Sequence, residues 1–201
     1  MNRFRALVRC AAGCLVLVTP CTAWCATRPV RIPMVCSRGA DETAFTASVT
    51  MPEAMPSGAT FTVRIDSHPS GEISHFGLNY IHDMTTQYLL PRGIHFVEGS
   101  ARVVPDTGTA NVRTGARAWH EAARIYMTMP AHIANGASYT PPSLEFSAQI
   151  DAPTGSHVAV EFARYEVIAN ALVVGDVRTE CEPTAKPCRL AMLRVEAPAS
   201  R

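Results

Sequence analysis

The cysteines are the residues of this 201-residue chain whose spacing points most directly to chemistry. Four of the seven lie within the first 25 residues, one follows at Cys36, and the last two are Cys181 and Cys188. In an oxidising compartment such cysteines form disulfides, which stabilise a fold and perform no catalysis. Two prolines lie among the residues between Cys181 and Cys188, and this spacing suits a small disulfide loop before a last strand.

The four cysteines from Cys25 onward permit three pairings. We expect a local pair, Cys181 with Cys188, and similarly Cys25 with Cys36. The small C-terminal loop would then stabilise the fold by about 2 to 3 kcal/mol. An alternative pairing joins Cys36 to Cys181 or to Cys188 and links the first segment of the mature chain to the last.

The N-terminal residues predict export. Arg3, Arg5 and Arg9 precede an apolar run from Cys10 to Val18, and small residues follow around Ala23. The run has about half of the roughly 20 residues that a membrane span needs, so no span is expected in the mature chain. Cleavage after Ala23 keeps an even number of cysteines, whereas cleavage after Cys25 leaves an odd one. We therefore predict a signal peptide over residues 1–23 and a secreted or cell-envelope protein.

Seven histidines and several methionines are the candidate metal ligands. A zinc or copper site requires several of them to converge. His120 and Glu121 open the zinc motif His-Glu-x-x-His, but Arg124 replaces its second histidine. Met127 and Met129 alternate along a predicted strand, where methionine commonly fills a core. We expect no metal and no cofactor. The alternative function, an exported metal-handling or hydrolytic protein, would use His75, His82, Asp83, His95 or His120.

Other catalytic patterns are missing from the sequence. It contains no Gly-x-Ser-x-Gly nucleophile elbow and no glycine-rich phosphate loop. The formal net charge is +1 and falls to about −2 once the arginines of residues 1–23 are removed, which argues against nucleic acid as a partner. No catalytic residue is predicted, and an enzyme is the weaker of the two function classes.

Short apolar-alternating segments separated by proline and glycine predict strands. Residues 45–51 and 60–66 alternate most regularly. Residues 116–126 contain good helix formers and would allow a short helix, but the alternation of residues 124–129 favours a strand. The remaining predicted strands are residues 73–90 as one or two strands, 94–97, 100–104, 144–150, 158–174 and 189–195.

This pattern predicts an all-β fold, a single antiparallel β-sandwich of the immunoglobulin-like type. About 178 residues follow residue 23, enough for one domain with a sizeable core. Residues 24–43 show little periodicity and are predicted to be an extended leader. The sandwich is expected over residues 44–196, with a tail over 197–201.

The segment from Leu90 to Ser100, LPRGIHFVEGS, resembles the Leu-Pro-x-Gly-x-x-Phe-Val-x-Gly-Ser strand and turn of a repeat domain in bacterial surface and secreted proteins. Residues 52–61 and 141–146 are similar to other turns of that domain. The resemblance implies an immunoglobulin-like sandwich without known enzymatic activity. This chain departs from the family in having one copy and cysteines near both ends. In the motif, Gly93 can adopt a positive φ, so that the chain reverses and Ile94 and Phe96 point into a core, and Gly99 permits a second turn or bulge.

The function that follows is a secreted bacterial immunoglobulin-like module with a binding or structural role at the cell envelope or outside the cell. Its partner would be an envelope polymer, a lipid or a protein. Binding residues are expected on loops, where conserved scaffolds commonly place them. The candidates are Trp119, His120, Tyr139 and Tyr80.

Overall fold

The computed structural model describes residues 25–38, 43–90 and 92–198. The predicted signal peptide, Pro91 and residues 199–201 of the predicted tail lie outside the described residues. The strands before the middle of the chain are β1 (Cys25–Cys36), β2 (Thr43–Pro52), β3 (Ala54–Pro56), β4 (Thr60–Ser67), β5 (Leu78–Leu89), β6 (Ile94–Phe96) and β7 (Arg102–Val103). After the short helix α1 (Ala110–Arg113) come β8 (Arg117–Glu121), β9 (Arg124–Met129), β10 (Ile133–Ala134), β11 (Leu144–Ile150), β12 (His157–Ala171), β13 (Gly175–Pro183) and β14 (Cys188–Glu196).

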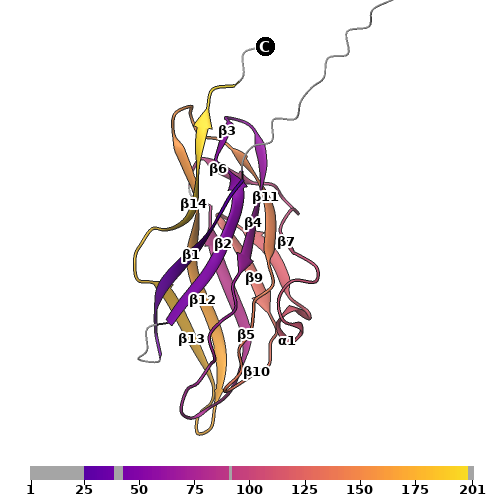
Figure 1. Ribbon diagram of the computed structural model, residues 1–201, viewed down its shortest axis with the longest axis vertical. Coiled ribbons are helices and arrows are strands. Elements are labelled where there is room, and N and C mark those ends of the chain that lie inside the picture. The colour runs from indigo at the N-terminus through magenta and orange to yellow at the C-terminus, as the bar shows by residue number, and fades with distance from the viewer. Residues whose placement is uncertain (1–24, 39–42, 91, 199–201) are drawn as a thin grey trace, which may run out of the picture.

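The strands form one folded sheet in the order β6-β11-β4-β2-β1-β13-β12-β5-β9-β8. Its two halves face each other and enclose a single apolar core (Figure 1). All strand pairs are antiparallel except β14 with β3. The prediction of an all-β, antiparallel sandwich in one domain is therefore confirmed. Among the described residues, no helix is long and apolar enough to cross a membrane.

Alternation of side chains along the strands accounts for the core. In β4, Phe61, Val63 and Ile65 are buried, as the sequence predicts, and the residues between them point outward. Met127 and Met129 are fully buried and act as core filler, which confirms that prediction. The predicted helix alternative over residues 116–126 is wrong, because β8 and β9 form a hairpin there in which Ala122 has a φ of +51°.

The predicted leader is a strand of the sandwich, which corrects the expected domain boundary at residue 44. β1 pairs with β2 from Cys25 to Met34 and with β13 from Met34 to Cys36, so it connects the two halves of the sheet. Ile32 and Met34 are buried in the core. Proline lacks an N–H for the ladder, and Pro29 and Pro33 are tolerated because β13 does not pair with β1 at those positions.

The disulfide joins Cys36 to Cys181, and the expected local pairs Cys181–Cys188 and Cys25–Cys36 are wrong. The strand register is the reason, because Cys36 and Cys181 lie directly opposite each other on β1 and β13 with their Cα atoms 3.9 Å apart. No hairpin precedes the last strand. β13 and β14 both run antiparallel to β12, one after the other, and Cys188 lies opposite Phe162 as a free thiol.

The motif at residues 90–100 behaves as the sequence predicts. Gly93 and Gly99 have φ values of +91° and +70°. Ile94 is buried, and Phe96 is half-buried and packs against the core. A Cβ atom on Gly93 would lie 2.8 Å from the Cβ of Ala152, so close packing as well as the turn requires glycine there. The predicted turn over residues 52–58 contains the short strand β3, which pairs with β14.

Candidate functional site

The outward side chains of β8, β9, β5 and β12 form the surface that we call the outer face. Its central row crosses four neighbouring strands, because the strand register places Trp119 opposite Tyr126, Tyr126 opposite Gln87, and Gln87 opposite Arg164. A β-bulge between Phe162 and Arg164 keeps Phe162 in the core and turns Arg164 outward. The alternation of four neighbouring strands thus lines up two aromatic rings, an amide and a guanidinium.

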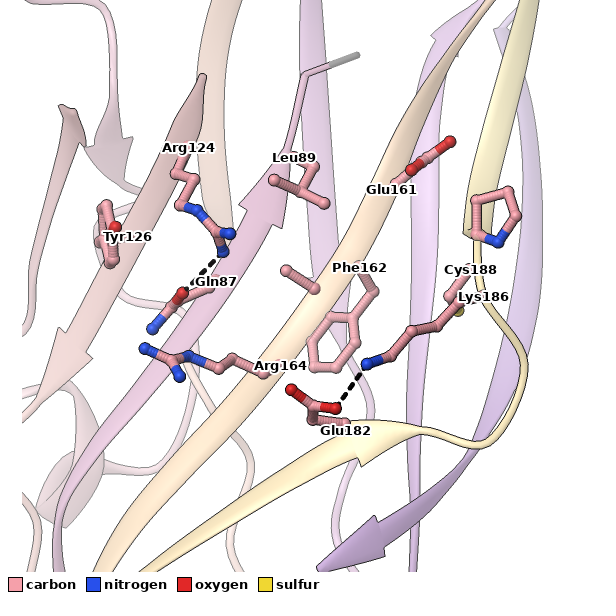
Figure 2. A pocket seen from close by; sticks show the side chains of 12 residues that line it. Gln87, Leu89, Arg124, Tyr126, Glu161, Phe162, Arg164, Glu182, Lys186 and Cys188 are labelled. Atoms are coloured by element: carbon pink, nitrogen blue, oxygen red, sulfur yellow. Dashed lines mark hydrogen bonds and ion pairs between the residues drawn. The ribbon is translucent and has the colours of Figure 1, made fainter. Parts of the chain in front are cut away.

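A hollow of about 740 Å³ lies on the outer face and is open to solvent (Figure 2). β5, β9 and β12 form its floor, and the segment between β13 and β14 forms one side. Three basic and two acidic side chains surround a partly apolar base. The lining residues are Gln87, Leu89, Arg124, Tyr126, Glu161, Phe162, Ala163, Arg164, Glu182, Lys186, Pro187 and Cys188.

Hydrogen bonds fix the polar groups of the hollow. Arg124 donates from Nη1 to Gln87 Oε1 at 3.2 Å, and Arg164 donates from Nη1 to Glu180 Oε2 at the same distance. The Nε atom of Arg164 is buried and has no hydrogen-bond partner among the described residues. A buried donor without a partner is unfavourable, so a hydrogen bond donated by this N–H to a ligand oxygen would be stabilising.

Lys186 forms an ion pair with Glu182 at the rim of the hollow, as Figure 2 shows. The hydrogen bond and charge of Lys186 hold the pKa of Glu182 below its usual value. The Glu182 carboxylate therefore stays ionised at neutral pH. The charges of the hollow are mixed in sign, which favours a specific ligand over a general polyanion.

Trp119 and Tyr126 stack at the edge of this face. Their ring centroids are 5.2 Å apart, and the planes differ by 9°. Trp119 remains 40% exposed although it is one of the largest apolar side chains of the chain. Within the described part of the chain β8 is the last strand of the strand order, so the stack lies at an edge of the sheet.

The free thiol of Cys188 also lines the hollow. Burial raises the pKa of this thiol, and the charge of Glu161 raises it further. The thiol is therefore protonated at neutral pH and is a poor nucleophile.

The histidines of the alternative function lie apart. His82 contacts Asp83 and Asp176, His95 contacts Asp151, and His120 stacks on Phe96. His120 and Glu121 are neighbours on a strand, so their side chains point to opposite sides. Within the described ranges, no group of three or more His, Cys, Asp or Glu side chains is arranged to hold a metal ion.

Of the four predicted contact residues, Trp119 lies on the outer face. Tyr139 is buried, contrary to the expectation of an exposed loop residue, and its hydroxyl lies 2.8 Å from that of Tyr165. Burial raises the pKa of both phenols, so they remain protonated and share this hydrogen bond inside the protein. His120 packs against Phe96, and the ring centroids of Tyr80 and His132 are 4.3 Å apart with the planes tilted by 38°.

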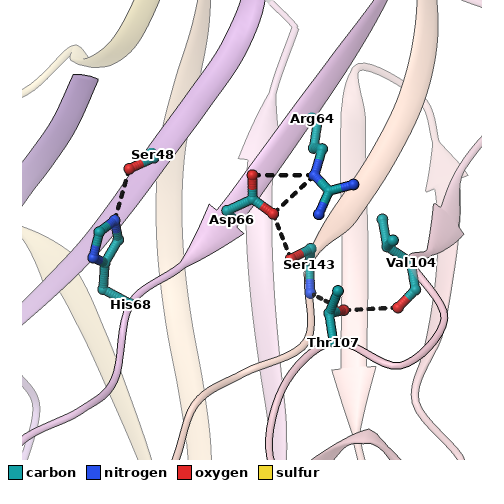
Figure 3. Close-up of polar contacts among 7 residues, drawn as sticks. All are labelled: Ser48, Arg64, Asp66, His68, Val104, Thr107 and Ser143. Carbon is teal, nitrogen blue, oxygen red and sulfur yellow. Dashed lines mark hydrogen bonds and ion pairs between the residues drawn. The ribbon is translucent and has the colours of Figure 1, made fainter. Parts of the chain in front are cut away.

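The opposite half of the sheet presents a face whose polar groups bond to one another (Figure 3). Asp66 accepts hydrogen bonds from Arg64 Nε at 2.9 Å and from Ser143 Oγ at 2.6 Å. The Ser143 N–H donates to Thr107, whose hydroxyl donates to the Val104 carbonyl. This network fixes the turn at residues 104–108 against β11, and we interpret it as structural.

Comparisons with known proteins give similar folds at low identity. No family model and no curated protein match the chain. A cohesin module from a family 33 glycoside hydrolase of Clostridium perfringens ATCC13124 has a TM-score of 0.43 at 7% identity, over 78% of this chain and 99% of that chain. The collagen binding domain of Erysipelothrix rhusiopathiae surface protein RspB has a TM-score of 0.41 at 10% identity, over 84% of this chain and 56% of that chain.

A third structure, a protein of Corynebacterium diphtheriae described as membrane anchored, has a TM-score of 0.44 at 14% identity. The match covers 87% of this chain and 38% of that one. All three are bacterial proteins, and two are surface-type proteins by their descriptions. The low TM-scores mean that nothing about a ligand is carried over from them to this chain.

Proposed function

We propose that this chain is an exported binding module that holds a protein partner on its outer face. The observation that supports this most strongly is the row from Trp119 through Tyr126 and Gln87 to Arg164 beside a hollow of about 740 Å³. Trp, Tyr and Arg are the residue types that contribute most to protein–protein binding. Here they lie together on a rigid sheet, which is a preorganised surface for binding.

The chemistry of the row indicates what the partner supplies. The exposed Trp119 ring offers an apolar platform for an aliphatic or aromatic side chain. Arg124 donates one bond within the protein, to Gln87, and Arg164 Nε is without a partner in the described part of the chain. A carboxylate in the hollow would accept from these guanidinium groups. We infer a partner segment that carries an acidic side chain beside an apolar one.

Two features support an exported location. Residues 1–23 have the composition of a signal peptide. The Cys36–Cys181 disulfide is typical of proteins outside the cytoplasm. We propose that the module works at the cell envelope or outside the cell.

A peptide selection tests the proposed surface. A display library of random dodecapeptides is selected on immobilised protein, with counter-selection on the Trp119→Ala, Arg164→Ala double variant. We expect acidic peptides with a neighbouring aromatic or aliphatic residue. Each single substitution should weaken binding of the enriched peptides by at least about fivefold, since truncation of a binding hot spot costs more than 1 kcal/mol. Affinity is measured by calorimetry.

Met192→Ala and Arg194→Ala are the matched controls. Met192 is 54% exposed and Arg194 forms an ion pair with Glu196, and both lie on β14 outside the lining of the 740 Å³ hollow. They should leave the affinity unchanged. Peptides that bind all variants equally would show that another surface binds, and the proposal would be wrong.

A further inference from the structure

Four apolar side chains protrude from one end of the molecule. Leu172, Val173 and Val174 form the turn between β12 and β13, and Phe76 lies in the segment before β5. Their exposed fractions lie between 68% and 109%, above those of every other exposed large apolar side chain among the described residues. The Leu172 N–H donates to the Gly77 carbonyl at 2.8 Å and ties the two loops together. We call these four residues the apolar tip.

The apolar tip lies at the end of the long axis opposite to the chain ends. Figure 1 shows the turn between β12 and β13 at the lower end of the molecule and the C-terminal strand β14 reaching the upper end. Cys25 pairs with Pro52, and Glu196 pairs with Pro56 in the neighbouring strand, so the first and last strands meet at that upper end. Among the described residues, the tip therefore lies at the end of the molecule opposite to the start of β1 and the end of β14.

The size and shape of the tip argue against a protein partner or a second copy as its occupant. A stable protein interface buries about 800 Å² on each side. The four apolar side chains of the tip are far fewer than the roughly 20 to 30 residues that each side of a stable interface contributes. A bilayer needs no complementary pocket, because apolar side chains enter its interfacial region individually.

A polar belt follows directly behind the tip. Asn79 donates to Asn170 at 3.0 Å, and Asn170 donates to Asp176 at 2.8 Å. Beside them, the ring of Tyr80 contacts that of His132 in a tilted arrangement. An apolar end followed by amides and a tyrosine matches the change from acyl chains to headgroups at a membrane surface, where tyrosine is enriched.

The charges near the tip indicate the kind of lipid. Residues 72–83, 130–135 and 170–176 contain no lysine or arginine. Their carboxylates are Glu72, Asp83 and Asp176, and their imidazoles are His75, His82 and His132, of which His82 contacts the last two carboxylates. Anionic lipid would therefore be repelled at neutral pH, whereas a zwitterionic surface would not be.

We propose that the apolar tip inserts into a zwitterionic lipid surface, so that the module contacts a membrane with the end opposite to its termini. This proposal does not depend on the proposed function of the outer face. The Phe and Val side chains supply the apolar area, and the belt of Asn79, Tyr80 and Asn170 remains at headgroup level.

Co-sedimentation of the mature protein with phosphatidylcholine vesicles at about pH 7.5 tests the proposal. We expect the wild-type protein to bind and the Phe76→Ser, Val173→Ser double variant to lose at least about tenfold in partition coefficient, because burial of a Phe or Val side chain contributes more than 1.4 kcal/mol. Replacing a third of the lipid by phosphatidylglycerol should weaken wild-type binding. Val35→Ser is the matched control, because Val35 is 63% exposed on β1, away from the tip.

Binding that is absent in the wild type, or equal in the wild type and the double variant, would overturn the proposal. Sedimentation velocity without lipid adds a second readout. Self-association of the wild type that the double variant abolishes would show that a second copy covers the tip, and would also overturn it. The Trp119→Ala variant should bind vesicles normally, so failure of the outer-face proposal and failure of this one are distinguishable.

Discussion

His82 lies between two carboxylates at a β-bulge of β5. The bulge places two residues of β5 opposite Val167, and Asp83 has a φ of +50°. His82 Nδ1 lies 2.6 Å from Asp83 Oδ2, and Nε2 lies 3.4 Å from Asp176 Oδ1. Burial lowers the pKa of His82, but the hydrogen bonds and charges of both aspartates outweigh it and raise the pKa. The contact therefore connects β5 to β13 most strongly when the imidazole is protonated.

This arrangement predicts how stability depends on pH. Because the pKa of His82 is higher in the folded state than the unfolded value of 6.5, its stabilisation is fully present below that pH and is lost as the pH rises through the folded-state pKa. We expect His82→Gln to lower the Tm most at about pH 5.5 and progressively less at higher pH. Thermal unfolding of both proteins from about pH 5 to pH 9 measures this. A Tm difference that is constant, or that grows with pH, would contradict it.

At the scale of elements, the Cys36–Cys181 disulfide connects the strands that link the two halves of the sheet. It spans 145 residues of sequence. Closing so long a loop restricts the unfolded chain, and we expect its removal to lower the free energy of unfolding by about 4 kcal/mol. The Cys36→Ser, Cys181→Ser double variant in urea denaturation measures this. Cys188→Ser is the control, because this cysteine forms no disulfide. A fall of less than about 1 kcal/mol in the free energy of unfolding of the double variant would contradict the expectation.

The sequence predicts the elements that alternate clearly and misses those whose pairing is non-local. The strand at Leu144–Ile150 has the predicted bounds, because every second side chain is buried. The sequence does not predict β1, because Pro29 and Pro33 indicate a break. Both prolines are tolerated in the strand because β13 does not pair with β1 at those positions. β13 was missed because its outward residues are charged and its inward ones only weakly apolar.

The candidate site, like the fold, can be predicted from the sequence only where it does not depend on strand register. Trp119 could be chosen from the sequence as an exposed aromatic residue, but the row it belongs to depends on the register of four strands. Arg164 faces outward because of a bulge that no local pattern marks. Arg124 alternates with buried residues in β9, and this alternation is the feature of the sequence that predicts an outward Arg124 side chain. The disulfide likewise follows from strand register, which spacing along the chain does not determine.

At the scale of the whole molecule, the sandwich separates two kinds of surface. The outer face spans the sheet along the side of the molecule, and the apolar tip lies at one end (Figure 1). The other half of the sheet carries the Arg64–Asp66–Ser143 network, whose groups bond to one another. A module with this arrangement would contact a membrane end-on and leave its side open to a partner.

Chemical-shift mapping with a selected acidic peptide is the most direct test of the central claim, that the outer face is the binding surface. The peptide is titrated into isotope-labelled protein, and amide and indole shifts are followed. We predict the largest changes at Trp119, Tyr126, Gln87 and Arg164, with Thr62 and Arg64 on the opposite half of the sheet unchanged. Changes concentrated on β2, β4 and β11, with the Trp119 indole unaffected, would contradict it.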